Sequence, residues 1–274
     1  MNKWITGHQL ISYFILAFGI SWGIWIPVIL FLVKDGGWHP LLFAGVFGLF
    51  AAAIIVTWIS EGGSGLRKWL RRSFNVKINP AWYVLSWIVL PVAVGAFHFL
   101  LYYVFGGKPD FTGAEPWIKF VISVPIAALI AGGNEEPGWR GYALPKLTGR
   151  MSPLKASLLL GLIWSAWHIP LFTLQGWGGP EKHIGLFTVS VVGLSIVMTW
   201  LFYRSRMSVI PVMLFHQATN NISDAFPMPT DLIAGVDDWQ ILRGITYWVF
   251  AIILLIATKG RLGYHESGTG SGRT

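Results

Sequence analysis

The sequence predicts an all-α membrane protein, a polytopic bundle of about eight transmembrane helices with both termini in the cytoplasm. Of its 274 residues, 54% are hydrophobic and only 12% are charged, about half the share of roughly 25% that is usual in soluble domains. Mean hydropathy is +0.59. A water-soluble domain of this length needs more polar surface than this composition provides. The high hydrophobicity also excludes a disordered chain.

Eight segments are candidate spans, since a span needs about 20 mostly apolar residues. They are 8–33, 40–60, 80–105, 117–144, 154–173, 184–203, 208–225 and 240–258. The first could pass for a signal peptide, but it is too long and has no small-residue cleavage site, so we expect it to remain as a helix. We expect residues 1–260 to form a single transmembrane domain and the Gly/Ser-rich residues 261–274 to form a disordered tail.

The charges in the connections alternate along the chain. The N-terminus, the second, fourth and sixth connections and the tail are basic, whereas the other connections are neutral or acidic. Because cytoplasmic loops collect Lys and Arg, this pattern places both termini in the cytoplasm. It also accounts for the net charge of +8 without a nucleic-acid partner. The most basic segment, LRKWLRR at 66–72, is interpreted as a solvated cytoplasmic loop, with an amphipathic helix on anionic lipid as the alternative.

The chain contains no cysteine. This excludes disulfides, thiolate metal sites and a cysteine nucleophile. Any metal would need His and carboxylate ligands, and a hydrolytic nucleophile would be Ser, Thr, a carboxylate or water.

Three polar clusters lie within the predicted spans, where polar groups are costly and usually serve a function. They are NEEPGWR at 134–140, WSAWH at 164–168 and HQATN at 216–220. Side chains four residues apart share one face of a helix, so Glu136 and Arg140 are expected to pair. Glu135 points about 100° away from Glu136, which makes it the less neutralised of the two carboxylates.

The other two clusters show the same spacing. Trp164 lies one turn before His168 and can pack against its imidazole, and His216 shares a helix face with Asn220. Each histidine alone would be interpreted as a packing residue or as a hydrogen-bonding group between helices. The three clusters together favour a functional site.

Helical rise places the clusters at similar depths below the cytoplasmic face. If the fourth helix continues to about Leu144, Glu135 lies about 14 Å from its end, while His168 and His216 lie about 20 Å and 12 Å along theirs. We therefore expect the clusters to converge on one water-filled cavity, reached laterally or from the cytoplasm. A carboxylate that activates water, a neutral histidine and a His–Asn pair facing an oxyanion suit hydrolysis of a peptide bond.

The motifs EExxxR at 135–140, WxxxH at 164–168 and HxxxN at 216–220, in this order and on separate spans, resemble the CAAX-protease and bacteriocin-processing (CPBP, or Abi) family of intramembrane endopeptidases. Its eukaryotic member is the Ras-converting CAAX prenyl endopeptidase. The resemblance covers about residues 117–225, and GYALP at 141–145 resembles the bacterial branch. Trp164 stands where many members have Phe, which leaves a packing role intact.

This resemblance implies a role for seven residues. The implied catalytic residues are Glu135, His168, His216 and Asn220, and the implied supporting residues are Glu136, Arg140 and Trp164. Glu135 would activate water with the help of His168, and His216 and Asn220 would stabilise the oxyanion. The implied substrate is a lipidated or otherwise membrane-associated peptide or protein, which is a prenylated CAAX-type protein in the eukaryotic use of the family.

The resemblance leaves the cofactor open. We favour none, because a directly zinc-binding HExxH motif is absent from the sequence. Zinc or another divalent metal held by Glu135, His168 and His216 is the alternative.

The remaining alternatives concern function. The chain could be a non-catalytic bacteriocin self-immunity or scaffold protein, or a transporter that couples to protons or ions through the buried Glu and His. In each case it is expected to be an integral multi-pass protein, of the plasma membrane in a prokaryote.

Overall fold

The computed structural model describes residues 2–34, 37–108, 111–112, 116–174, 183–226 and 238–264, and within these ranges the regular structure is entirely helical. The elements are α1 (Asn2–Gly7), α2 (Gln9–Phe31), α3 (Leu42–Val46), α4 (Gly48–Ser73), α5 (Ala81–Val84), η1 (Leu85–Val89), α6 (Leu90–Val104), α7 (Trp117–Ile130), η2 (Gly132–Glu135), η3 (Pro137–Ala143), α8 (Leu144–Thr148), α9 (Pro153–Trp167), η4 (Ile169–Thr173), α10 (Ile184–Arg204), α11 (Ile210–Ala225) and α12 (Asp238–Thr258). Of the η elements, η2 and η4 are 3₁₀ helices, and η1 and η3 are π-helices. Most of the predicted disordered tail, residues 265–274, lies outside the described residues.

The predicted all-α, multi-pass membrane fold is confirmed. Six helical stretches of the described chain are long and apolar enough to cross a membrane. They are Gln9–Phe31, Leu42–Ser73, Ala81–Val104, Trp117–Glu135, Ile184–Arg204 and Gln240–Thr258. The two other predicted spans are also helical, but α9 has 15 residues and α11 has 16, fewer than the roughly 20 of a typical span. The first, α9, packs against α10 and exposes Leu159 and Leu162 on its other face, whereas α11 is largely buried and contacts α7 and α6.

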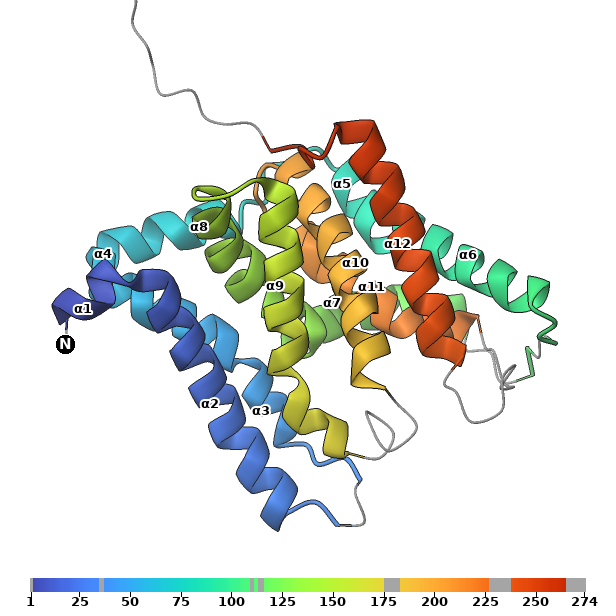
Figure 1. Cartoon of the computed structure of the whole chain (residues 1–274), viewed down its shortest axis with the longest axis horizontal. Coiled ribbons are helices and arrows are strands. Elements are labelled where there is room, and N and C mark those ends of the chain that lie inside the picture. The colour runs from blue at the N-terminus through green and yellow to red at the C-terminus, as the bar shows by residue number, and fades with distance from the viewer. Residues whose placement is uncertain are drawn as a thin grey trace, which may run out of the picture.

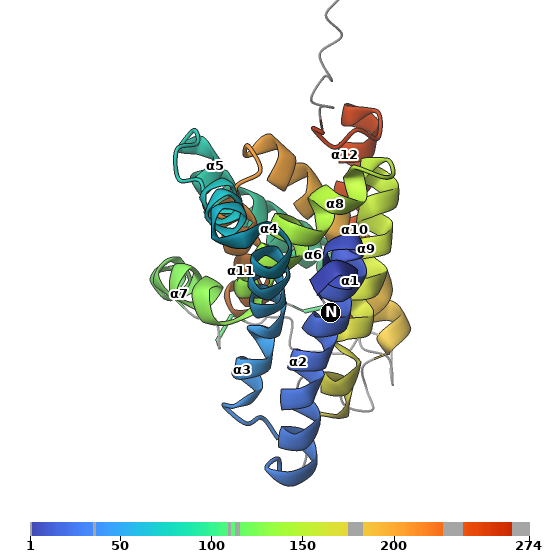
Figure 2. The same ribbon diagram turned by 90° about the vertical axis from the view of Figure 1, so that its left-hand side faces the viewer.

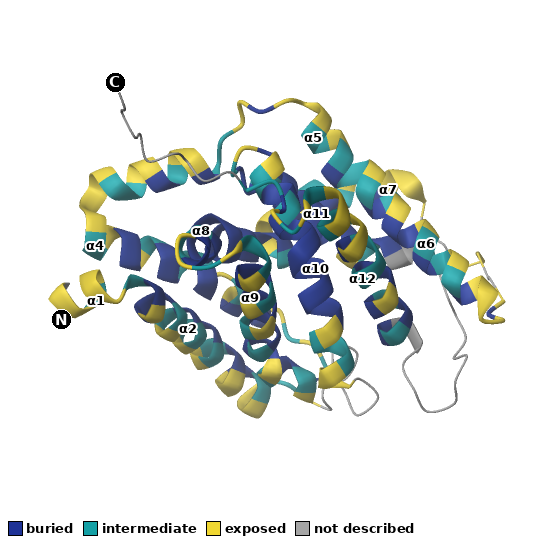
Figure 3. Ribbon diagram, turned by 45° about the horizontal axis from the view of Figure 1, so that its top comes forward, coloured by how far each residue is buried: buried dark blue, intermediate teal, exposed yellow. Residues whose placement is uncertain are grey.

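Large apolar side chains cover the outer surface of the bundle. Exposed examples on α2, α7 and α12 are Ile11, Ile15, Leu30, Phe31, Ile118, Ile122, Ile126, Leu129, Ile252, Ile253 and Ile256. A soluble monomer rarely exposes apolar area on this scale, whereas lipid tails accept it without cost. Figure 3 shows the complementary pattern, in which α10 and α11 are largely buried at the centre and α4 is exposed along its second half.

Small and hydroxylated residues hold α9 against α10. The hydroxyl of Ser157 donates to that of Thr199 at 2.9 Å, and the hydroxyl of Ser195 donates to the backbone oxygen of Ser157 at 2.9 Å. Gly161 packs so closely that a Cβ there would lie 2.8 Å from the Cα of Val192. Such close approach and interhelical hydrogen bonding are typical of helix pairs in membranes, and they fix α9 where it positions its tryptophan and histidine.

The predicted continuous helix over 117–144 is wrong. The chain leaves the helical conformation at Ala131 (φ −122°, ψ −142°), forms the single turn η2, and then the π-helix η3. Two consecutive glycines follow the break, and glycine is a poor helix former. A Cβ at Gly133 would lie within 2.7 Å of backbone atoms of Ala128 and Met213, so no other residue fits there. The predicted depth of Glu135, about 14 Å from the helix end, assumed a continuous helix and therefore does not apply.

The ends of the bundle differ in the connections that they carry. Figure 1 shows the α8–α9 turn and the C-terminal end of α12 at the top, and the C-terminal end of α2 and η4 at the bottom. Figure 2, turned by 90°, shows the same separation. The basic connections of the sequence therefore gather at one end of the molecule.

Candidate active site

One cavity, of about 330 Å³, collects the residues that the three motifs predict. Glu135, His168, His216 and Asn220 all line it, together with Trp164. Aromatic and aliphatic side chains form most of the remaining wall, among them Trp25, Trp38, Phe43, Trp167, Leu171, Phe187, Val191 and Leu194. An apolar cavity with a few convergent polar groups is the usual form of a ligand or active site. The expected convergence of the clusters is thus observed.

The Glu135 carboxylate is oriented by two indoles. It is 4% exposed, and its Oε2 accepts hydrogen bonds from Trp164 Nε1 at 2.7 Å and from Trp139 Nε1 at 3.3 Å. Both donors reach the same oxygen, so they hold the carboxylate in one orientation. The sequence predicts a packing role for Trp164, and the structure adds this hydrogen bond.

Glu136 lies in a buried ion-pair network behind the cavity wall. Arg140 Nη1 is 3.0 Å from Glu136 Oε2, and neither side chain is accessible to solvent, which confirms the predicted pairing. His216 Nδ1 also contacts Glu136 Oε1, at 2.8 Å. Because a carboxylate only accepts hydrogen bonds, Nδ1 carries a proton. Neither Glu136 nor Arg140 lines the cavity, so the network supports the site from outside.

His168 is fixed from one side in the same way. Its Nδ1 lies 2.9 Å from the backbone oxygen of Trp164, and since a carbonyl only accepts, Nδ1 again holds a proton. The ring is T-shaped against Trp167 and Phe187, at centroid distances of 4.8 and 5.2 Å. Trp164 lies between the histidines, 6.1 Å from His168 and 5.1 Å from His216.

A glycine creates the space in front of Asn220 and His216. A Cβ at Gly132 would lie 2.6 Å from Asn220 Nδ2 and 2.9 Å from His216 Nε2. Two side-chain nitrogens therefore point at the bare Cα of Gly132 from α11. The Oδ1 of Asn220 accepts a hydrogen bond from Arg243 Nη2 at 3.3 Å. This bond leaves the amide NH₂ of Asn220 facing Gly132.

The motifs did not predict three residues of this arrangement: Gly132, Trp139 and Arg243. For Trp139 there was a signal, because it stands four residues after Glu135 within the first cluster. For the other two residues the signals were a Gly-Gly pair before the first motif and an isolated arginine near the start of the last span. Neither signal indicates which polar group it meets, because each partner comes from a distant part of the chain.

Among the described residues, no group of three or more His, Cys, Asp or Glu side chains is placed to hold a metal ion. The Nδ1 atoms of His168 and His216 already contact protein acceptors.

The fold and the cavity define an integral multi-pass membrane protein whose cavity is lined by the buried Glu135, His168 and His216 and by the exposed Asn220. Residues 116–222, which include all seven predicted site residues, match the family of the type II CAAX prenyl endopeptidase, Rce1-like. The chain is also 28% identical to CAAX prenyl protease 2 of Methanococcus maripaludis over 266 residues, covering 90% of this chain and 93% of that protein. The resemblance seen in the motifs is confirmed, and these matches support an intramembrane endopeptidase activity.

Proposed function

We propose that this protein hydrolyses a peptide bond of a membrane-associated substrate, including prenylated CAAX-type substrates, with a water that Glu135 activates. The observation that supports this proposal is the convergence of a buried carboxylate, two histidines and an asparagine on one cavity. The names of the related proteins supply the substrate class.

In the first step, the oxygen of a water molecule attacks the peptide carbonyl carbon and its proton passes to Glu135. Oε2 of this carboxylate is occupied by two indole donors, so Oε1 takes the proton. The neutral His168 accepts a hydrogen bond from the same water through Nε2 and orients it. A positioned base of this kind contributes about 10²–10⁴-fold to the rate.

The carbonyl oxygen gains negative charge in this step and needs donors. The Nδ2 of Asn220 and the Nε2 of His216 meet over Gly132, and we assign the oxyanion to that space. His216 acts here as an imidazolium, with Nδ1–H donating to Glu136 and Nε2–H donating to the oxyanion. Removal of one such donor costs about 10²–10³-fold in kcat in other hydrolases.

In the second step, the C–N bond breaks as the carbonyl re-forms. The leaving nitrogen takes the proton from Glu135, so the products are a carboxylic acid and an amine, and the Glu135 carboxylate is regenerated. Glu136 and Arg140 do not touch the substrate in this scheme. They are positioning residues that hold His216 through the buried ion pair.

Cleavage of a fluorescent prenylated CAAX peptide by the purified full chain tests the proposal. We expect Glu135→Gln to lower kcat by about 10²-fold or more, and His168→Ala to lower it as well. Glu61→Gln and His8→Ala are matched controls, because both residues are exposed and lie outside the cavity, and they should keep the wild-type rate.

Three outcomes would contradict the proposal. If Glu135→Gln cleaves at the wild-type rate, the mechanism is wrong. If the wild-type chain binds the peptide without cleaving it, a scaffold or immunity role replaces catalysis. If Glu135→Gln abolishes ion uptake into vesicles and no cleavage is detected, the chain is a transporter.

A further inference from the structure

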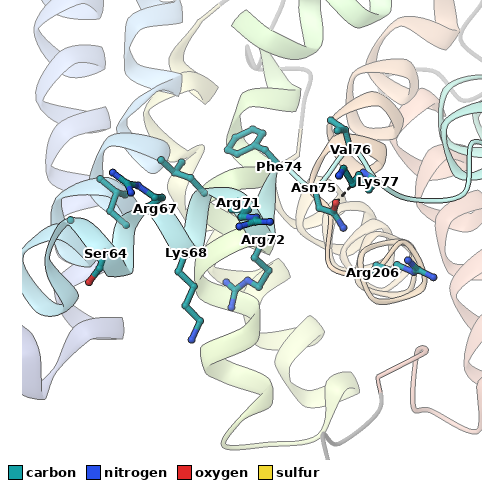
Figure 4. Close-up of a pocket in the computed structure, with 13 residues that line it drawn as sticks. Ser64, Arg67, Lys68, Arg71, Arg72, Phe74, Asn75, Val76, Lys77 and Arg206 are labelled. Carbon is teal, nitrogen blue, oxygen red and sulfur yellow. Dashed lines mark hydrogen bonds between the residues drawn. The ribbon is translucent and has the colours of Figure 1, made fainter.

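Arg243 differs in position from the basic side chains at the surface of the bundle. Figure 4 shows six of those around an open hollow at the end of α4 and the α10–α11 connection: Arg67, Lys68, Arg71, Arg72, Lys77 and Arg206. Arg243, near the start of α12, instead lines the cavity of the candidate active site. It is the only Lys or Arg among the described residues that line this cavity. Charged side chains within membrane spans usually serve a function.

Two neighbours hold the Arg243 guanidinium in place. Its Nε donates to the hydroxyl of Tyr247 at 2.9 Å, and its Nη2 donates to Asn220 Oδ1 at 3.3 Å. A guanidinium has five N–H donors, and these bonds use only two of them. Among the described residues, no carboxylate forms an ion pair with Arg243, and no acceptor meets its Nη1. The cavity wall therefore contains a fixed cation with donors to spare.

A second polar group of the cavity wall also lacks a partner. Gln217, on α11, lines the cavity and is 6% exposed. Its Nε2 donates to Asn221 Oδ1 at 2.6 Å, but no donor in the described part of the chain reaches its Oε1. Buried polar atoms are nearly always hydrogen-bonded, so this acceptor indicates a ligand that supplies the donor. The backbone N–H groups of an extended peptide are such donors.

The polar side chains of the cavity come mainly from one side of the bundle. Two helices, α11 and α12, contribute Gln217, Asn220, Gln240, Arg243 and Tyr247. The lining residues from α2, α3 and the connection between them are all apolar: Trp25, Trp38, Phe43 and Val46. Figure 1 shows α2 and α3 on the left of the bundle and α11 and α12 on the right. A ligand with one charged end is therefore expected to direct that end toward α11 and α12.

We infer that Arg243 binds the C-terminal carboxylate of the substrate. The inference rests on the proposed function, because a CaaX sequence is the end of its chain and so carries a carboxylate close to the bond that is cleaved. Arginine is well suited to this ligand, since its planar N–H groups form charge-assisted hydrogen bonds with both oxygens of a carboxylate.

The distances are compatible with this role. Three residues of extended peptide span at most about 10 Å, so every bond within a CaaX sequence lies within that distance of the carboxylate. The Asn220 amide, whose Nδ2 we assign to the oxyanion, is one hydrogen bond of 3.3 Å from the guanidinium. One short peptide can therefore reach both groups. Arg243 would then select bonds near the end of a chain over bonds in an internal loop.

Two peptides test the inference: the fluorescent prenylated peptide with a free C-terminal carboxylate, and the same peptide with a C-terminal carboxamide. We expect the full wild-type chain to cleave the acid with a kcat/KM about 10–100-fold higher than the amide, mainly through KM. Arg243→Gln should cleave both with similar kcat/KM, whereas Arg243→Lys keeps the charge and should retain part of the preference. Arg206→Gln is the matched control, because Arg206 is exposed and lies outside the cavity, and it should keep the full preference.

A role limited to holding Asn220 gives a different result. In that case Arg243→Gln would lower kcat for both peptides by the same factor, and the preference for the acid would remain. This outcome would overturn the inference, and so would a wild-type chain that cleaves the two peptides equally well. If Arg243→Gln does not fold, the comparison between the wild-type chain and Arg243→Lys still decides, because an unchanged preference in Arg243→Lys would show that the planar guanidinium is not needed.

Binding separates this inference from the proposed function. Fluorescence anisotropy of the same peptides with purified Glu135→Gln requires no cleavage. We expect the acid to bind about 10–100-fold more tightly than the amide, and the double variant with Arg243→Gln to bind both with similar affinity. If this difference is present but the wild-type chain cleaves neither peptide, the proposed hydrolysis fails and the carboxylate site stands. Equal affinities with Glu135→Gln alone would refute the carboxylate site.

Discussion

Substitution of Gly132 by alanine tests the assignment of the oxyanion site. The added Cβ would lie 2.6 Å from Asn220 Nδ2 and 2.9 Å from His216 Nε2, whereas ordinary contact begins near 3.4 Å. The Asn220 amide would therefore have to retreat by about 0.8 Å. A displacement of this size at a reacting centre costs about 10²-fold, and the loss of one oxyanion donor costs about 10²–10³-fold.

We therefore expect Gly132→Ala to lower kcat by about 10²-fold while the protein stays folded. The fold should survive because the atoms displaced are the ends of side chains that border a cavity. The assay is a progress curve for the fluorescent peptide, combined with thermal unfolding in detergent. Gly185→Ala is the control, because a Cβ there meets nothing within 4 Å.

Two results separate catalysis from structure in this experiment. Gly133→Ala should fail to fold, since its Cβ would meet backbone atoms. This variant therefore shows how a structural defect appears in the same two measurements. If Gly132→Ala cleaves within about twofold of the wild-type rate, the donors do not act at this position and the assignment is refuted.

Three further predictions concern the network around the cavity. Glu136→Gln leaves the fully buried Arg140 guanidinium without its carboxylate and should lower the free energy of unfolding by about 3–5 kcal/mol; an unchanged melting temperature in detergent would contradict this. Trp164→Phe keeps the ring but removes the 2.7 Å hydrogen bond to Glu135, so kcat should fall by about tenfold with little change in KM, and a change in KM alone would argue against a role in orienting the carboxylate. A chelator should leave the cleavage rate unchanged, whereas loss that zinc restores would show that a metal takes part.

The sequence predicts the class of protein well because that class depends on composition. Low charge and long apolar runs leave only a membrane bundle, and no tertiary contact can change that. The local pairing of Glu136 with Arg140 is also predicted, because it depends only on residues four positions apart. The motif resemblance identifies seven residues for the same reason, since it rests on spacing within short segments.

The sequence does not predict the break in the helix before Glu135. A Gly-Gly pair lowers helix propensity, but a hydrophobic run of this length is compatible with a helix that continues through it. The break is fixed by backbone atoms of α7 and α11 that leave no room for a Cβ at Gly133. The contact with Met213 of α11 joins positions 80 residues apart in the chain, and helical periodicity carries no information on it.

Sequence alone therefore determined the medium in which this protein folds and the alternation of charge between its connections, and it indicated the candidate side chains of the site. These properties depend on the composition of the chain or on patterns within short segments. The tertiary structure decided that the side chains meet in one cavity and that Gly132 makes room for two nitrogen donors. Those features depend on how helices distant in sequence pack, where single ångströms between backbones decide which atoms can meet.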